Sequence, residues 1–174
     1  QRQDSLKNTK LGIYDAVIVQ EQESRNFRAT LYDFLAHRAL DFYMNTEPEI
    51  TKPAYKFEIN SEDYFQSYDV FIKYNITSKD SLSLKYYAMK IFQELLYFHA
   101  KDADPLALVD VDLKRLGFIR SYSTSEFKDS LYLEALRKLE KRFFNLASSS
   151  EVTYYIANEY YTQGVKYNPL NSDE

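Results

Sequence analysis

Three polar side chains in the first half of the chain are the residues best placed for chemistry. Asp33, His37 and Asp41 are spaced four residues apart, which places them on one face of a helix. Two carboxylates beside an imidazole could orient a general base or hold a cation. The helix separates the first residue from the last by about 12 Å, too far for a single metal ion. We therefore interpret them as a surface ion ladder or a buried, hydrogen-bonded histidine, and an enzyme built on them is the least favoured hypothesis.

His99 and an acidic cluster close to it in sequence are the other candidates for chemistry. His99 falls near the end of a predicted helix, where an imidazolium interacts favourably with the helix dipole. No serine, cysteine or second histidine is placed by sequence to complete a triad with it. A calcium loop needs ligands at alternating positions and a glycine, whereas Asp104 followed by Pro105 is typical of a helix start. The acidic residues of the cluster are Asp102, Asp104, Asp110 and Asp112. We predict no catalytic, cofactor-binding or metal-binding residues.

Several kinds of site are excluded by what the composition lacks. The chain has no cysteine, which excludes disulfides, thiolate zinc sites, thiol nucleophiles and thioesters. Glycine-rich phosphate loops, the HExxH zinc motif and the nucleophile elbow are also absent from the sequence. With 26 acidic and 22 basic residues, the chain is not expected to bind nucleic acid. No apolar run approaches the roughly 18 residues of a membrane span, so we predict none.

Tyrosine is unusually abundant, with 17 residues, while tryptophan is absent. Aromatic rings with a polar rim suit contacts with sugars or with protein partners. The alternative is that adjacent tyrosines cover two faces of a helix and serve packing, which we favour over a glycan site. The residues kept as a candidate interaction surface are Tyr64, Tyr68, Tyr74, Tyr154 and Tyr161.

The length and composition are typical of one globular domain. Of the 174 residues, 45% are apolar and 28% are charged, which excludes global disorder. Only 3 glycines and 4 prolines are present, too few for the tight turns of an all-β sandwich. Apolar periodicity and capping residues instead predict a series of helices. These helices cover residues 30–45, 61–68, 80–100, 104–119, 125–143 and 148–164.

The order of these helices predicts an all-α fold of antiparallel helical hairpins. Sliding the chain by 47 residues aligns Leu84 with Leu131, Ala88 with Ala135, Phe92 with Leu139, Val109 with Ile156 and Gly117 with Gly164. Stacked helix pairs of this kind form an α-solenoid of the tetratricopeptide-like type. The predicted divisions are an extended or mixed segment at 1–26, a helical-hairpin domain at 27–166 and a tail or linker at 167–174. Residues 46–60 are predicted to form an extended excursion, and 11–26 and 69–77 stay open between helix and strand.

One run of sequence resembles a known family. Residues 27–42 read FRATLYDFLAHRALDF, similar to the RPTLYDFLAHRALDF segment in the N-terminal helical region of large bacterial alpha-2-macroglobulin-like envelope proteins. Residues 80–86 and 154–161 also resemble that region. Ala29 stands where the family pattern has proline. The resemblance extends over about residues 27–165, and its specific part is the first run.

The resemblance implies a protein that traps proteases, in which this helical region is an accessory or scaffolding part. It carries no functional residue over to this chain. It further implies a location in the bacterial periplasm or at the outer cell surface, and a fragment whose partners are downstream domains of the same polypeptide, proteases or envelope proteins. The alternative is a stand-alone, repeat-type adaptor that binds a peptide or glycan in a groove lined by tyrosines.

Overall fold

The computed structural model describes residues 2–19, 24–45 and 54–166, and over these ranges the regular secondary structure is helical. The all-α fold class is as predicted. Residues 46–53 of the predicted excursion and the tail at 167–174 lie outside the described residues. The elements are α1 (Arg2–Asn8), η1 (Leu11–Tyr14), α2 (Ser24–Phe27), α3 (Leu31–Tyr43), η2 (Glu62–Phe65), α4 (Tyr68–Phe71), α5 (Leu84–His99), α6 (Leu106–Tyr122), α7 (Lys128–Arg142) and α8 (Ser149–Lys166).

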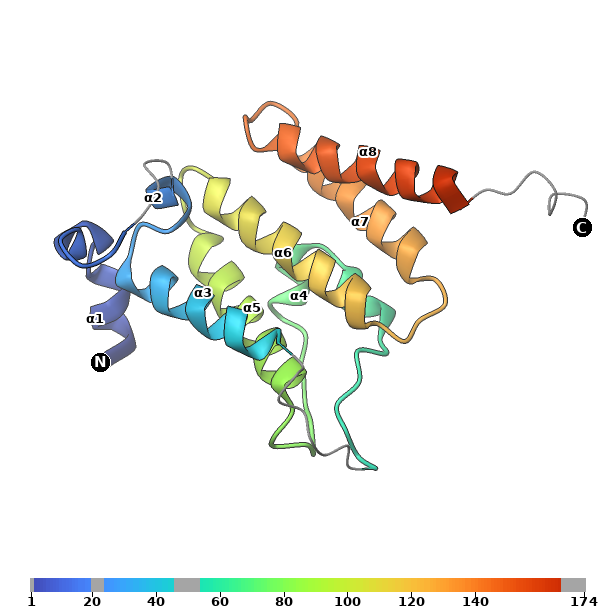
Figure 1. The fold of residues 1–174 in the computed structure, drawn as a ribbon, viewed down its shortest axis with the longest axis horizontal. Coiled ribbons are helices and arrows are strands. Elements are labelled where there is room, and N and C mark those ends of the chain that lie inside the picture. The colour runs from blue at the N-terminus through green and yellow to red at the C-terminus, as the bar shows by residue number, and fades with distance from the viewer. Residues whose placement is uncertain (1, 20–23, 46–53, 167–174) are drawn as a thin grey trace, which may run out of the picture.

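The five long helices are arranged in two layers. Along the chain α3 packs against α5, α5 against α6, α6 against α7 and α7 against α8. Helices α3, α6 and α8 lie in one layer, with α6 between the other two, while α5 and α7 lie in the second layer (Figure 1). Short connections join α5 to α6, α6 to α7 and α7 to α8, and they make these neighbours antiparallel. The tetratricopeptide-like form of this stacking stays a prediction.

Positions matched by the predicted 47-residue periodicity are buried alike. The end of α8, in contrast, differs from the predicted one. Ala88 and Ala135 are both buried, and so are Phe92 and Leu139. Each matched pair thus uses the same face of its helix. Gly164, at which the predicted helix 148–164 ends, lies inside α8, which continues to Lys166. Glycine is favoured after a helix end but tolerated within one.

Local capping explains where two of the helices begin. The hydroxyl of Thr30 accepts a hydrogen bond from the N–H of Asp33, and the Asp33 carboxylate accepts one from the N–H of Thr30, forming the predicted capping box. Helix α5 begins about one turn later than predicted. Its cap is Ser83, whose hydroxyl accepts from the N–H of Tyr86 at 3.2 Å, because the carboxylate of Asp80 is occupied in the preceding turn.

The segment from residue 54 to residue 83 packs against the helices and contributes to the core. Its helices η2 and α4 contact α5, α6 and α7. Phe57, Ile59 and Phe71 are buried, and the carbonyl of Ile59 accepts a hydrogen bond from the N–H of Thr124 at 3.0 Å. The part left open between helix and strand forms α4 followed by turns.

Parts of the N-terminal segment are helical where we expected an extended or mixed segment. Residues 2–8 form α1, which packs against α3, and a short 3-10 helix follows. Leu11 is almost completely buried. Backbone hydrogen bonds of 2.9 Å run from Leu11 N–H to the carbonyl of Ala29 and from Leu31 N–H to the carbonyl of Thr9. These contacts join the segment to the start of α3, which local sequence patterns do not reveal.

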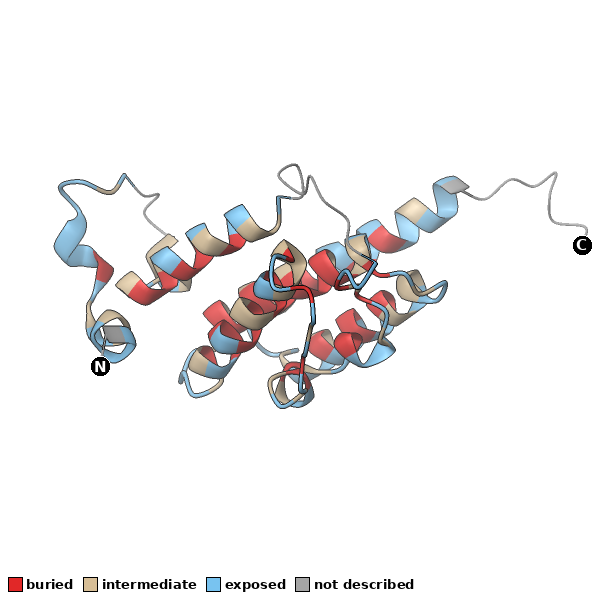
Figure 2. Cartoon of the chain, turned by 90° about the horizontal axis from the view of Figure 1, so that it is seen from below, coloured by how far each residue is buried: buried red, intermediate tan, exposed pale blue. Residues whose placement is uncertain are grey.

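The hydrophobic core lies between the two helical layers and the 54–83 segment. Figure 2 shows the buried positions on the facing sides of the helices, with exposed positions on their outer sides. The largest completely buried apolar side chains include Leu40, Ile59, Phe71, Phe92, Leu96, Leu116 and Ile119. No helix within the described residues combines the length and apolar character needed to cross a membrane.

Candidate functional site

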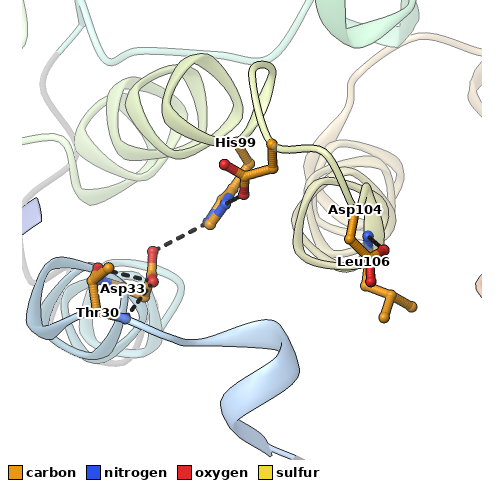
Figure 3. Close-up of polar contacts among 6 residues, drawn as sticks. Thr30, Asp33, His99, Asp104 and Leu106 are labelled. Atoms are coloured by element: carbon orange, nitrogen blue, oxygen red, sulfur yellow. Dashed lines mark hydrogen bonds and ion pairs between the residues drawn. The ribbon is translucent and has the colours of Figure 1, made fainter. Parts of the chain in front are cut away.

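A buried imidazole between two carboxylates joins α3, α5 and the loop after α5 (Figure 3). His99, in the last turn of α5, has its Nδ1 atom 2.7 Å from Oδ2 of Asp102 and its Nε2 atom 3.1 Å from Oδ1 of Asp33. The second carboxylate oxygen of Asp33 accepts hydrogen bonds of 2.9 Å from the N–H and the hydroxyl of Thr30. His99 therefore links the first turn of α3 to the last turn of α5.

The carboxylates favour a positive charge on His99. Burial lowers the pKa of His99, but the hydrogen bonds and charges of Asp33 and Asp102 outweigh burial and raise the pKa above 6.5. Burial raises the pKa of Asp33, and the contacts with His99 and Thr30 outweigh it, so this pKa falls below 3.8. Because both ring nitrogens already contact carboxylates, His99 has no free nitrogen to accept a proton from a substrate. The geometry suits a residue that positions two helices.

His37 lies in a different environment from His99. The ring is 2% exposed, and neither nitrogen has a hydrogen-bond partner among the described residues. Burial and the nearby charges of Arg28 and Lys114 lower the pKa of His37 to about 3, so the ring is neutral at ordinary pH. The hydrogen bond expected for a buried histidine is therefore not observed.

The predicted ion ladder along α3 is also not formed. Asp33 contacts His99, while Asp41 points to α6 and pairs with the Nζ atom of Lys114 at 2.8 Å. The two carboxylates thus face different partners on different helices. His37 forms a hydrogen bond with neither carboxylate. The structure does not bring the three residues together as a catalytic group.

The acidic cluster is likewise dispersed among separate partners. Asp102 contacts His99. Helix α6 begins one residue later than predicted, with Pro105 as its N-cap, and the carboxylate of Asp104 just before it accepts from the N–H of Leu106 at 3.1 Å. Asp112 pairs with the buried side chain of Arg115 at 2.7 Å. Within the described ranges, no group of three or more potential ligands is arranged to hold a metal ion.

A groove of about 370 Å³ runs along α6 between the end of α3 and α8. Apolar side chains form most of its surface. Its lining residues are Met44, Leu113, Lys114, Gly117, Phe118, Ser121, Tyr122 and Tyr155. Concave, mainly apolar sites with a few polar groups are typical of ligand-binding surfaces. This groove is the candidate binding site.

Polar contacts hold both walls of the groove. On one side, the Lys114–Asp41 ion pair and a 3.3 Å hydrogen bond from the hydroxyl of Tyr122 to the carbonyl of Met44 join α6 to α3. On the other side, Arg120 pairs with the buried carboxylate of Glu159 at 2.7 Å and joins α6 to α8. These polar contacts therefore fix the spacing of the three helices that form the groove.

Gly117 leaves the floor of the groove open. A Cβ atom at this position would meet no other atom within 4 Å, so close packing does not require a glycine here. Glycine within a helix costs about 1 kcal/mol relative to alanine. The missing side chain instead deepens the groove, and the carbonyl of Gly117 accepts a hydrogen bond from the hydroxyl of Ser121 at 2.9 Å.

The five tyrosines predicted as an interaction surface separate into two groups. Tyr64 and Tyr68 are buried, and Tyr74 is half-buried with its ring against Tyr64, so these three serve packing rather than forming an open surface. Tyr154 and Tyr161 are 67% and 71% exposed on α8. Their role in binding stays a prediction.

Sequence patterns did not reveal Tyr155, Gly117 or Arg115 in these roles. In the sequence Tyr155 lies within the 154–161 run that resembles the family, and Gly117 is one position of the 47-residue alignment. The buried guanidinium of Arg115 donates to the carbonyls of Tyr64 and Gln66 and contacts Asp112. An aspartate three residues before an arginine on a helix predicts an ion pair between them. No local pattern predicts the contacts of Arg115 with the distant carbonyls.

No family model, curated protein or solved structure matches this chain.

Proposed function

We propose that this chain is a non-catalytic helical scaffold that binds an extended segment of a partner protein in the groove along α6. The observation that carries the proposal is the groove itself, an apolar depression with a helix-interior glycine at its floor. Helical layers commonly use such surfaces for peptide recognition. Apolar side chains of the bound segment would contact Met44 and Tyr155, and a ring or aliphatic side chain would lie over Gly117.

The chemistry of the lining favours a protein segment over a glycan. A sugar needs several convergent hydrogen-bonding groups for its hydroxyls, since unpaired polar groups oppose binding. Among the lining residues, Lys114 is paired with Asp41, and the hydroxyls of Ser121 and Tyr122 donate to backbone carbonyls. The surface that remains is largely apolar and suits side chains such as leucine or phenylalanine.

Two features of the histidines support a non-catalytic role. Both ring nitrogens of His99 contact carboxylates, and His37 is buried away from the groove lining. Neither residue is placed to act on a molecule bound along α6. A reaction would require a nucleophile or base at the bound segment.

The resemblance at residues 27–42 supports a proposal about the larger protein to which this scaffold belongs and about its location in the cell. We propose an accessory region of an alpha-2-macroglobulin-like envelope protein, located in the periplasm or at the outer cell surface. The bound segment then belongs to a downstream domain of the same polypeptide, a protease or an envelope protein. A stand-alone adaptor would use the same groove.

The test is a selection of binders with a matched pair of variants. A phage-displayed library of random 12-residue peptides is selected on the purified chain, and the affinities of enriched peptides are measured by fluorescence anisotropy. Gly117→Leu fills the groove and is expected to weaken binding at least about tenfold. Gly164→Leu is the control, because it makes the same change inside α8 where a Cβ also meets no atom within 4 Å.

The proposal fails if no peptide is enriched or if both glycine variants bind the enriched peptides as well as the original chain. Both substitutions replace a helix-interior glycine by a better helix former, so neither is expected to reduce stability. Thermal unfolding of the two variants checks this point.

A further inference from the structure

We propose that the segment bound in the groove is basic, with a lysine or arginine side chain placed between Asp110 of α6 and Glu151 of α8. This inference rests on the proposed function and names the chemistry of the partner. It would give the groove an apolar part over Gly117 and an acidic end.

Helical spacing places this acidic end next to the groove. Asp110 precedes Lys114 by one turn and Gly117 by two, so the three share a face of α6. Glu151 precedes Tyr155 by one turn on α8. Helices α6 and α8 lie in the same layer and run in the same direction, since each is antiparallel to α7 (Figure 1). The two carboxylates therefore lie at the same end of the groove.

The two carboxylates influence each other across the interface between α6 and α8. Burial raises the pKa of Glu151, and the charge of Asp110 raises it further. Burial is the largest cause of the raised pKa of the Tyr155 hydroxyl, and the charges of Glu151 and Asp110 raise this pKa further. This mutual repulsion would be relieved by a cation bound between them.

Asp110 lacks a direct partner of its own. Its Oδ2 atom is buried without a hydrogen bond, and among the described residues neither Asp110 nor Glu151 forms an ion pair. Three cations act on Asp110 from a distance, namely Arg28, Lys114 and His99, but burial dominates and its pKa is raised. Lys114 is already paired with Asp41, and His99 lies between two carboxylates. An incoming guanidinium or ammonium group would supply the missing partner.

A partly buried Asp110 and an exposed Glu151 beside an apolar depression select peptides by charge as well as by shape. Because Asp110 is partly buried, its interaction with a bound cation is screened by salt less than one on an open surface, whereas that of the exposed Glu151 is screened more. Basic segments are therefore expected to be favoured over neutral and acidic ones, with the preference reduced but not lost in high salt.

The experiment uses the complete chain and synthetic peptides labelled with fluorescein. Each peptide holds a phenylalanine, with arginine, glutamine or glutamate placed one to four residues away on either side. We expect the arginine peptides to bind about tenfold more tightly than the glutamine peptides, and the glutamate peptides to bind weakest. The double variant Asp110→Asn, Glu151→Gln is expected to bind arginine and glutamine peptides equally.

The control double variant is Glu126→Gln, Glu134→Gln, which removes the same net charge from exposed positions outside the groove. It should keep the preference for arginine. Loss of the preference in both double variants would overturn the inference in favour of a general effect of net charge.

The outcomes separate this inference from the proposed function. Binding that Gly117→Leu abolishes but that shows no preference for arginine would overturn the basic segment and leave the groove as the site. Absence of binding by every peptide, together with an empty phage selection, would overturn both.

Discussion

The two histidines of this chain bind protons with opposite consequences for folding. His99 has two carboxylate partners, whereas His37 is buried without a partner among the described residues. The first therefore has a raised pKa and the second a lowered one. At the scale of single residues, these environments decide how stability depends on pH.

Replacing His99 by glutamine is expected to reduce the free energy of unfolding by about 2 kcal/mol at pH 6, because Asp33 loses a charged partner while staying buried. The stabilisation by His99 is fully present below its unfolded pKa of about 6.5 and is lost as pH rises through the raised folded pKa. Urea unfolding between pH 5.5 and 8.5 measures it. The difference between the original chain and His99→Gln should shrink as pH rises. A difference that grows with pH would contradict the imidazolium assignment.

Replacing His37 by leucine is expected to change stability by less than about 1 kcal/mol at pH 7, since no hydrogen bond is lost. The pKa of His37 falls from 6.5 to about 3 on folding, so the unfolded chain takes up the proton first as pH falls. The original chain should therefore lose stability relative to His37→Leu between pH 6.5 and about 3. Urea unfolding across this range checks the trend. A constant difference would mean that the ring takes up its proton with the same pKa in the folded and the unfolded chain.

At the scale of elements, the 54–83 segment is held by two buried polar side chains from the helices beneath it. Arg115 of α6 donates to the carbonyls of Tyr64 and Gln66, and its guanidinium lies 4.4 Å from the ring centre of Phe71. Gln93 of α5 donates to the carbonyl of Phe71 at 2.9 Å. These contacts satisfy carbonyls of an irregular segment that has few partners of its own.

The variant Arg115→Met is expected to lower the free energy of unfolding by about 3 kcal/mol, because it leaves Asp112 buried and unpaired. Amide hydrogen exchange should accelerate selectively at residues 59–76, where the segment loses its anchors. The control is Lys138→Met, which breaks an exposed pair with Glu134 within α7 and should cost less than about 1 kcal/mol. Equal protection of residues 59–76 in both variants would show that the apolar contacts alone hold the segment.

At the scale of the whole molecule, local patterns predicted what depends on neighbours in sequence. The capping box at Thr30, the helix start just after Asp104 and the all-α class all follow from residues within a few positions of one another. The His99–Asp102 contact is also local, three residues apart. Such features can be predicted because the helix brings nearby residues together in a fixed way.

The groove and the anchoring of the 54–83 segment depend on partners distant in sequence. His99 contacts Asp33, and Arg115 contacts the carbonyl of Tyr64, 51 residues away. The same limit explains the tyrosines, because residue type alone does not tell a buried ring such as Tyr64 from an exposed one such as Tyr161. Only the packing of the two layers decides which rings remain exposed.

The most direct test of the proposed scaffold is to map the peptide on the protein by nuclear magnetic resonance. The ¹⁵N-labelled chain is titrated with a peptide enriched in the phage selection, and amide shifts are followed to saturation. We predict that the perturbed amides cluster at Met44, at residues 113–122 and around Tyr155, and that Gly117→Leu abolishes the shifts. Saturable shifts centred instead on Tyr161 or on residues 54–76 would contradict the groove as the binding site.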